Sequence, residues 1–278
     1  MSVKLSQVTY ALEHFAPLPL QEGWDNAGLQ IGLTEGEDVS GALLCLDVTE
    51  AVVAEALRRG CNLVVSHHPL LFRGLKQISA ADPVQRAVMM AVRNNVAVVS
   101  MHTNMDNAPG GVNWMMARRL GLEQCAFFGP EKHCTVQASQ GGEKAEGRTV
   151  TGASGVLGRL PQPLQAADFV AKVKHTFGVD CAMCNELLHR RVATVALCGG
   201  AGDFLLPDAV AAGADAFITG EMHYHQYFGY EQRLQICVIG HYQSEQYTQQ
   251  LFQEILSEAC PGLPTFIAET CTNPIIYM

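Results

Sequence analysis

Short apolar runs alternate with helix-like segments along most of this chain, and this alternation limits the fold more than any other feature. The runs are continuous and rich in Val, Ile, Leu and Ala, and they span residues 42–48, 62–66, 96–102, 191–197, 214–220 and 234–240. Continuous runs of this kind are typical of parallel strands that helices cover on both faces of a sheet. The sequence therefore predicts an α/β fold.

The first three runs and the last three belong to segments that resemble each other. LCLDVTEAVVAEALRRGCNLVVSHHP aligns with VALCGGAGDFLLPDAVAAGADAFITGEMH, and VAVVSMHTNMD aligns with QICVIGHYQSE. This alignment pairs His102 with His241. It also pairs Asp106 with Glu245. The repeat indicates two related α/β domains that face a shared cleft, with chance similarity between two βαβ units as the alternative.

A polar, Gly-rich stretch, QASQGGEKAEGR, interrupts the alternation in the middle of the chain. Residues 123–155 form the weakest part of the pattern, and we interpret them as a linker or an exposed hairpin. We expect domain 1 to contain residues 1–122 plus 250–278, and domain 2 to contain residues 123–249, with the polar linker near 135–150.

Charge and hydropathy narrow the functional classes. The 278 residues carry a formal net charge of −9, so the chain lacks the basic surface that binding to a nucleic-acid backbone requires. No apolar run approaches the ~18 residues of a membrane span, and the N-terminal segment lacks a signal-peptide core. The ten cysteines are expected to be reduced thiols. We therefore expect a cytoplasmic protein without membrane contact, for which nucleic acid is a disfavoured partner.

Metal-type side chains stand at the ends of three of the strand-like runs. They are His67 and His68 after the second run, His102 and Asp106 at the end of the third, and His241 and Glu245 after the sixth. Ligands of parallel α/β folds bind beyond the carboxyl ends of the strands. Imidazole together with carboxylate suits Zn, Mn, Fe, Co or Ni. The spacing therefore indicates a metal site.

The adjacent pair His67–His68 bears on the number of metal ions. Neighbouring side chains point in different directions from an extended backbone, so one ion is hard to satisfy with both imidazoles. Two ions joined by a bridging carboxylate would use both. Such pairs of ions activate a water molecule and stabilise an oxyanion in many hydrolases. The alternative is that the strand-end histidines are structural and hydrogen-bonded.

Two further features have two interpretations each. Gly199, Gly200 and Gly202 follow a strand and precede a helix, so their amides form either a phosphate cradle or a tight strand–helix turn. Asp25 and Asn26 in WDNAG either line the cavity or form an Asx turn.

The same residues lie in motifs that resemble those of the Nif-three-like family, the relatives of NGG-interacting factor three, often labelled GTP cyclohydrolase I type 2. The motifs are WDNAGLQIG, SHHPLLF, HTNMDNAPGGVN, CGGAG, TGEMHYH and GHYQSE, in the order of the family. They extend over most of the chain. No inserted mid-chain domain is evident, so the chain resembles the compact members.

This resemblance implies two α/β domains that face a shared metal-binding cleft, a toroidal homohexamer, and two divalent first-row metal ions in each subunit. The family's metal ligands correspond to His67, His68, Asp106, His241 and Glu245. Glu245 is the expected bridging ligand and, with His225 as general acid or base, the expected catalytic pair. His102 is expected to be a ligand or to orient one, and His223 is either a surface residue or part of the site.

These expectations favour a metal-dependent hydrolase. Its substrate is a nucleotide, as the GTP cyclohydrolase label implies, or another small phosphorylated or cyclic molecule. The chain has no P-loop pattern, so metal ions would have to recruit any phosphate oxygens. The alternative is a non-catalytic hexameric metal-binding scaffold, a metal carrier or a regulatory interaction protein. The sequence leaves the native metal and the substrate open.

Overall fold

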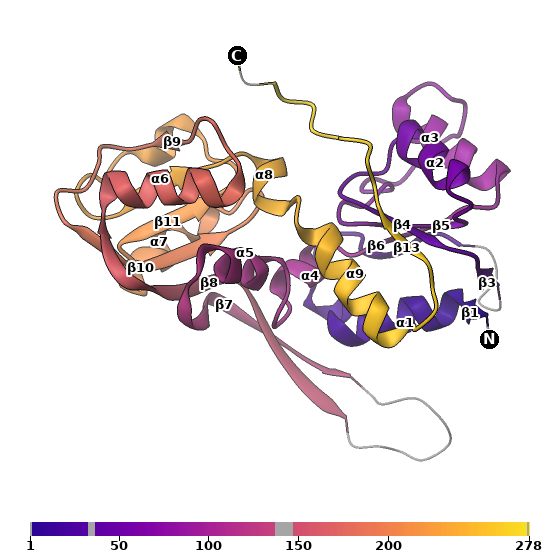
Figure 1. Ribbon diagram of the computed structural model, residues 1–278, viewed down its shortest axis with the longest axis horizontal. Helices are drawn as coiled ribbons and strands as arrows, with labels where there is room; N and C mark the ends of the chain where they lie inside the picture. The colour runs from indigo at the N-terminus through magenta and orange to yellow at the C-terminus, as the bar shows by residue number, and fades with distance from the viewer. Residues whose placement is uncertain (1, 33–36, 137–146, 277) are drawn as a thin grey trace. The chain divides into compact units, whose positions relative to one another are not determined.

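The computed structural model describes residues 2–32, 37–136, 147–276 and 278, and the chain divides into two compact units (Figure 1). Unit 1 consists of Met1–Ala108, Cys134–Val150 and Thr248–Pro274, and unit 2 of Pro109–His133, Thr151–Tyr247 and Ile275–Met278. Residues 109–122, which we expected in the first domain, group with unit 2. The reason is that Met116 and Leu120 from this segment are part of the core of unit 2.

Unit 1 is built on a five-stranded sheet. Its strand order is β13 (Thr265–Ile267), β4 (Ala42–Cys45), β5 (Leu63–Ser66), β6 (Ala97–Ser100) and β2 (Gly28–Ile31). The first four strands are parallel, and β2 runs antiparallel to β6. Every residue of β4, β5 and β6 is buried, as expected of apolar strands that are covered on both faces.

Helices cover both faces of the unit 1 sheet (Figure 1). On one face lie α2 (Glu50–Arg58) and α3 (Pro83–Arg93), and on the other α1 (Leu5–Phe15) and α9 (Thr248–Ala259). The α2–α3 face is a continuous core in which Val53 and Ala91 pack on strand residues such as Val64. A two-stranded sheet of β1 (Val3–Lys4) and β3 (Asp38–Val39) completes the unit.

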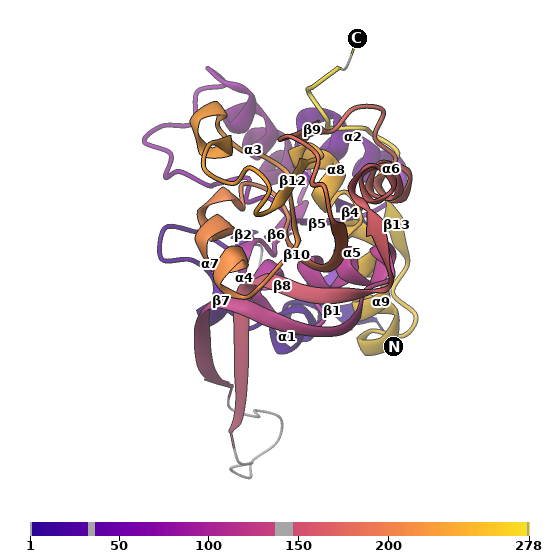
Figure 2. The ribbon, with the colours of Figure 1, turned by 90° about the vertical axis from the view of Figure 1, so that its left-hand side faces the viewer.

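Unit 2 is built on a six-stranded sheet. Its strand order is β7 (Glu123–Val136), β8 (Arg148–Gln165), β10 (Arg191–Cys198), β11 (Ala216–Thr219), β12 (Gln235–Val238) and β9 (Met183–Cys184). β10, β11 and β12 are parallel, whereas β8 and β9 are antiparallel to their neighbours. β7 and β8 lie side by side in both views (Figure 2). The weak stretch therefore contains two paired strands, and residues 137–146 of the expected linker lie outside the described residues.

Helices also cover the unit 2 sheet. α5 (Val112–Leu120) and α6 (Ala166–Phe177) share a core with strand residues such as Leu197 and Ile218. α7 (Leu206–Ala211) packs in a second core with Phe217 and Ile236. α6 ends at Gly178, whose φ of 64° suits the left-handed cap of a helix. No helix among the described residues is long and apolar enough to cross a membrane.

The two units repeat one arrangement of elements. The series β4–α2–β5 in unit 1 has its counterpart in β10–α7–β11 of unit 2, and β6 corresponds to β12. A short helix follows the third strand in each case, α4 (Thr103–Asn107) in unit 1 and α8 (His241–Glu245) in unit 2. The structure therefore has the α/β fold, and it repeats strand–helix–strand order in the way that the aligned segments indicate.

Candidate metal centre

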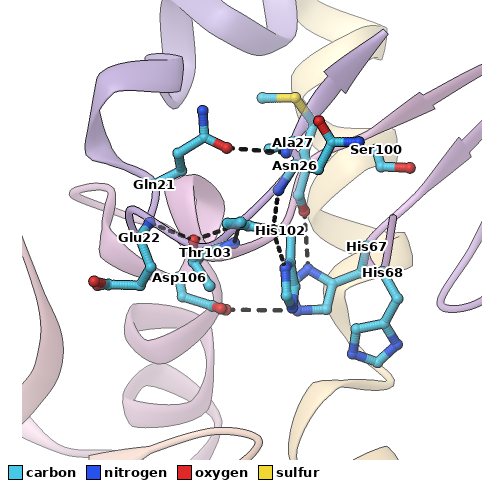
Figure 3. Close-up of polar contacts among 12 residues, drawn as sticks. Gln21, Glu22, Asn26, Ala27, His67, His68, Ser100, His102, Thr103 and Asp106 are labelled. Atoms are coloured by element: carbon cyan, nitrogen blue, oxygen red, sulfur yellow. Dashed lines mark hydrogen bonds and ion pairs between the residues drawn. The ribbon is translucent and has the colours of Figure 1, made fainter. Parts of the chain in front are cut away.

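Three imidazoles gather at one edge of the unit 1 sheet. His67 and His68 follow the last residue of β5, and His102 comes two residues after the end of β6. Because β5 and β6 are parallel neighbours, their carboxyl ends meet at the same edge. One nitrogen from each of the three rings lies within 4.8 Å of the other two. The three histidines therefore form a cluster that could hold a metal ion (Figure 3).

An oxygen acceptor fixes the Nδ1 atom of each imidazole. His67 Nδ1 is 2.9 Å from the Met101 carbonyl oxygen. His68 Nδ1 is 2.8 Å from Asp47 Oδ1, and His102 Nδ1 is 2.7 Å from Asp25 Oδ1. A carbonyl or carboxylate oxygen only accepts, so each Nδ1 carries the proton. In the neutral imidazole, Nε2 is then the nitrogen without a proton, which is the form that ligates a metal ion, and its orientation is set by the outer oxygen.

The carboxylates behind His68 and His102 are held in the charged form. The side chain of Asp25 is buried, which raises its pKa, but hydrogen bonds from His102 and Thr103 outweigh burial and lower the pKa to about 2. Burial likewise opposes ionisation of Asp47, and the bonds from His68 and Thr272 outweigh it and lower its pKa. Both carboxylates therefore accept from an imidazole over the whole neutral range.

Asp106 is the carboxylate of this cluster. It lies on α4, four residues after His102, and its Oδ1 is 3.6 Å from His67 Nε2. Figure 3 shows its carboxylate directed at the His67 ring. His67 is completely buried, and the Asp106 side chain retains 18% exposure. Unit 1 thus brings together His67, His68 and Asp106 as expected, and His102 joins them.

Unit 2 presents a second pair of metal-type side chains at the corresponding edge of its own sheet. His241 and Glu245 are the first and last residues of α8, and the i, i+4 spacing puts both on one face of the helix. His241 Nε2 is 3.1 Å from Glu245 Oε2, and His241 Nδ1 is 3.2 Å from Glu221 Oε1. Glu245 is nearly buried, with 4% of its side chain exposed.

The glycine turn after β10 makes room for Glu245. At Gly200, where φ is +58°, an added Cβ would lie only 2.4 Å from Glu245 Oε1. At Gly199 it would lie 3.4 Å from Glu245 Cγ. A side chain at Gly200 would therefore crowd the glutamate, whereas one at Gly199 would only touch it, and φ at Gly200 is itself unfavourable for other residues. The turn therefore positions a carboxylate of the candidate site.

The same turn does not form a phosphate cradle. The amide of Gly199 donates to Asn113 Oδ1 at 2.7 Å, and that of Gly200 donates to Ser244 Oγ at 3.0 Å. The amide of Gly202 donates to Thr219 Oγ1 at 3.0 Å. All three donors are committed to side chains of unit 2, so of the two interpretations the tight turn is the right one.

A pocket of about 310 Å³ opens beside His241 in unit 2. Glu221, His223 and His241 supply its titratable imidazole and carboxylate groups. His225 is not among its lining residues; it lies in the 3₁₀ helix η3 (Tyr224–Tyr227), is exposed, and stacks on Phe228 with ring centroids 6.3 Å apart. The structure thus puts His223, rather than His225, in a pocket with His241.

Three acidic residues contribute to the site in ways that the sequence did not reveal. Asp25 accepts from the amide of the next residue, Asn26, at 2.7 Å, which is not the Asx turn, and it orients His102. Asp47 orients His68. Glu221 faces His241. The available signal was that Asp47 and Glu221 also stand just after strands of the two sheets, where His67 and His241 stand.

Comparisons with known proteins place relatives along nearly the whole chain. The family model for Duf34/NIF3 (NGG1p interacting factor 3) matches residues 3–274. A protein of Clostridium perfringens named "GTP cyclohydrolase 1 type 2 homolog" is 31% identical over 244 residues, which are 87% of each chain. A protein of the same name from Streptococcus pneumoniae is 30% identical over 224 residues, 79% of this chain and 77% of its own.

Solved structures show the same fold. The Staphylococcus aureus protein SA1388 superposes with a TM-score of 0.86 at 24% identity, over 99% of both chains. A Bacillus cereus protein related to NIF3 gives a TM-score of 0.83 at 24% identity, over the full length of both chains. The match of the family model over nearly the whole length shows that the chain belongs to the Duf34/NIF3 (NGG1p interacting factor 3) family.

Proposed function

We propose that this protein is a metal-dependent hydrolase with a dinuclear centre of divalent first-row ions. The proposed ligands are His67, His68, Asp106, His241 and Glu245. The observation that carries the proposal is the cluster of three imidazoles in unit 1, each with its Nδ1 hydrogen-bonded to an outer oxygen. Structural histidines need one such bond each, but they have no reason to gather so that one nitrogen of each ring lies within 4.8 Å of the other two.

The chemistry of the donors fits first-row ions. Imidazole nitrogens with carboxylate oxygens suit Zn, Mn, Fe, Co and Ni, whereas sites for Mg or Ca are dominated by oxygen. The proposal takes ligands from both units, because the corresponding sheet edge of unit 2 carries His241 and Glu245. The family resemblance implies that Glu245 would be the bridging ligand. In that role Glu245 would offset part of the charge of two divalent ions.

Different residues of the chain would have different roles in catalysis. When bound, two such ions lower the pKa of a water molecule and stabilise negative charge on the substrate. Asp25 and Asp47 keep the imidazoles of His102 and His68 in one orientation, so that little reorganisation is needed during the reaction. His225, exposed on η3, would hold a proton and deliver it to the leaving group.

The proton donor can be identified by a pair of variants. His225→Ala is expected to lower turnover by ~10²–10⁴-fold while leaving the metal content unchanged. His223→Ala is the matched comparison, because His223 lines the pocket with His241. A loss in His223→Ala alone would transfer the role to that residue.

The names of the relatives support a nucleotide as substrate. Curated relatives from several bacteria carry the name "GTP cyclohydrolase 1 type 2 homolog". A small phosphorylated or cyclic molecule fits the proposal equally. The family resemblance further supports a toroidal homohexamer in the cytoplasm, which light scattering on the purified protein would test.

The proposal is tested by turnover of the metal-loaded protein on a panel of nucleotides and small phosphoesters. We expect hydrolysis that a chelator abolishes and that Glu245→Gln lowers by several powers of ten. Glu254→Gln, a change in α9 away from the imidazole cluster, is the control and should retain activity. Full metal loading with no turnover of any substrate would instead favour the non-catalytic scaffold or metal carrier.

A further inference from the structure

Two large aromatic side chains stay exposed beside the imidazole cluster of unit 1. Trp24 is 62% exposed and Phe72 is 45% exposed. Their ring centroids are 5.8 Å apart in an edge-to-face arrangement, and each centroid is 6.1 Å from that of His102. An aromatic pair of this size is normally buried, because burial of its surface is favourable. The pair therefore needs an explanation.

The two loops that carry this pair are joined to each other. Asn26 Nδ2 donates to the carbonyl oxygen of Leu71 at 2.8 Å. The amide of Leu71 donates in turn to Gln30 Oε1 at 3.1 Å. Asn26 lies two residues after Trp24, and Leu71 immediately precedes Phe72. The distance between the two rings is thus set by hydrogen bonds next to them rather than by chance packing.

The pair is also joined to the candidate metal centre. Asp25, the residue after Trp24, accepts from His102 Nδ1 at 2.7 Å and from the Thr103 amide at 3.0 Å. The edges of both aromatic rings meet the ring of His102 at interplanar angles of 70° and 82°. Any molecule that contacts the exposed part of the pair is therefore close to a histidine of the centre.

We propose that Trp24 and Phe72 form a stacking site for a planar nitrogen heterocycle, the ring of a nucleobase, in the substrate of this centre. The proposal rests on the proposed function and narrows its substrate class, since a non-aromatic phosphoester would gain nothing from the pair. Aromatic side chains stack on any base through its π-face. Because the planes of the two rings are 67° apart, a base that stacks on one of them meets the other edge to face. Asn26 and Gln30 are bonded to backbone groups of the same loops, so recognition here is of ring faces rather than of a particular base edge.

Fluorescence of Trp24 tests the stacking directly. The chain has two tryptophans, and Trp114 packs against the core of unit 2, so Trp114→Phe leaves Trp24 as the sole reporter. Guanosine is titrated into the full-length protein, with and without added Mn²⁺ or Zn²⁺. We expect guanosine to quench the fluorescence, and ribose 5-phosphate, which has no aromatic ring, to leave it unchanged.

Variants separate stacking from other causes of quenching. Phe72→Leu should weaken guanosine binding by between about 5-fold and about 150-fold, the range typical of one lost stacking partner. Phe204→Leu is the matched control, because Phe204 is 57% exposed but belongs to unit 2, and it should bind as the parent does. Trp24→Leu, measured by calorimetry, replaces Phe72→Leu if that variant does not fold.

The outcomes distinguish this proposal from the proposed function. Unchanged guanosine affinity in Phe72→Leu, with metal content intact, overturns the stacking site and leaves the hydrolase proposal standing. Quenching that persists in a protein that takes up no metal supports stacking and removes the hydrolase. Trp24 that acrylamide cannot quench, in an assembly that Trp24→Leu dissociates, would show that a second copy of the chain covers the pair and would overturn the proposal.

Discussion

The two units use one strand–helix arrangement to deliver different chemistry. In unit 1, His102 precedes the short helix after the third parallel strand and Asp106 lies in it, and in unit 2, His241 and Glu245 are the ends of the corresponding helix. Unit 1 surrounds this position with further imidazoles, each with Nδ1 bonded to an outer oxygen. In unit 2, Gly199 and Gly200 lie next to Glu245 instead.

This difference shows what the two kinds of candidate ligand need at the carboxyl ends of the strands. An imidazole ligand needs an acceptor behind it, because the acceptor fixes its tautomer and direction. A buried glutamate needs space and partners instead, since its carboxylate is larger than the turn would otherwise admit. Variants that change each requirement separately test whether the two units differ in this way.

The largest effect is expected from closing the space in unit 2. Gly200→Ala would place a Cβ 2.4 Å from Glu245 Oε1 at a φ of +58°, so we expect metal binding to be lost. Gly178→Ala controls for the backbone alone, because φ there is +64° and no atom lies within 4 Å of the added Cβ. That control should cost ~1–2 kcal/mol in stability and keep its metal. Equal metal content in both variants would contradict the role of the turn.

A buried acid in unit 1 should give the next largest effect. Glu55 accepts hydrogen bonds from the amides of Glu269 and Thr270 and from Arg59, and although burial raises its pKa, these bonds lower it to about 2. Asp215 plays a similar part in unit 2, where it accepts from the amides of Ala193 and Thr194.

Glu55→Gln is expected to cost about 3 kcal/mol of unfolding free energy at neutral pH, from a folded pKa near 2 and an unfolded one near 4.3. A depressed folded pKa stabilises above the unfolded pKa, so the stabilisation is lost as pH falls from about 5 toward about 2. Urea unfolding at several pH values measures it. A cost that does not change with pH would show that the carboxylate charge is not responsible.

Neutralising the carboxylates that accept from His102 and His68 should lower the metal affinity of the centre without abolishing metal binding. Asp25→Asn and Asp47→Asn are each expected to lower metal affinity by ~10–100-fold, the usual effect of losing an outer hydrogen-bond partner. Competition with a fluorescent chelator gives the affinities. Asp180→Asn, an exposed site in unit 2, is the matched control. Affinities equal to that control would mean that the imidazoles are held by packing alone.

The smallest effect concerns the first crossover helix of each unit. Thr49 Oγ1 accepts from the Val52 amide at the start of α2, whereas the corresponding start of α7, after Leu205, has no side-chain cap. Thr49→Ala should therefore lower stability by ~1 kcal/mol. Leu205→Ala would act through the core instead, so its loss should scale with buried volume and exceed that of Thr49→Ala.

Strands and helices with strong periodicity were predictable from the sequence. The six strand-like runs all appear in the structure. β9 and β13 were missed, since strands of two or three residues depend on tertiary pairing rather than on local pattern. α6 was also missed; it follows β8, whose first part lies in the stretch of residues 123–155 that we interpreted as a linker or an exposed hairpin.

The expectation that ligands bind beyond the carboxyl ends of parallel strands identified the candidate metal ligands. It did not identify the carboxylates that hydrogen-bond to them. His67, His68 and His102 were identifiable because parallel strands bring their carboxyl ends to one edge. Asp25 lies 77 residues from His102, and Asp47 lies 21 residues from His68. Nothing local in the sequence links such pairs, so only the folded chain reveals which carboxylate stands behind which imidazole.

Metal stoichiometry of the purified protein, by plasma mass spectrometry, tests the central claim most directly. We predict close to two first-row ions per chain, lost in the double variant His68→Ala, Glu245→Gln and retained in His189→Ala, where the changed histidine is an exposed one. No bound metal in the parent protein, and none taken up on reconstitution, would contradict the account and make the strand-end histidines structural.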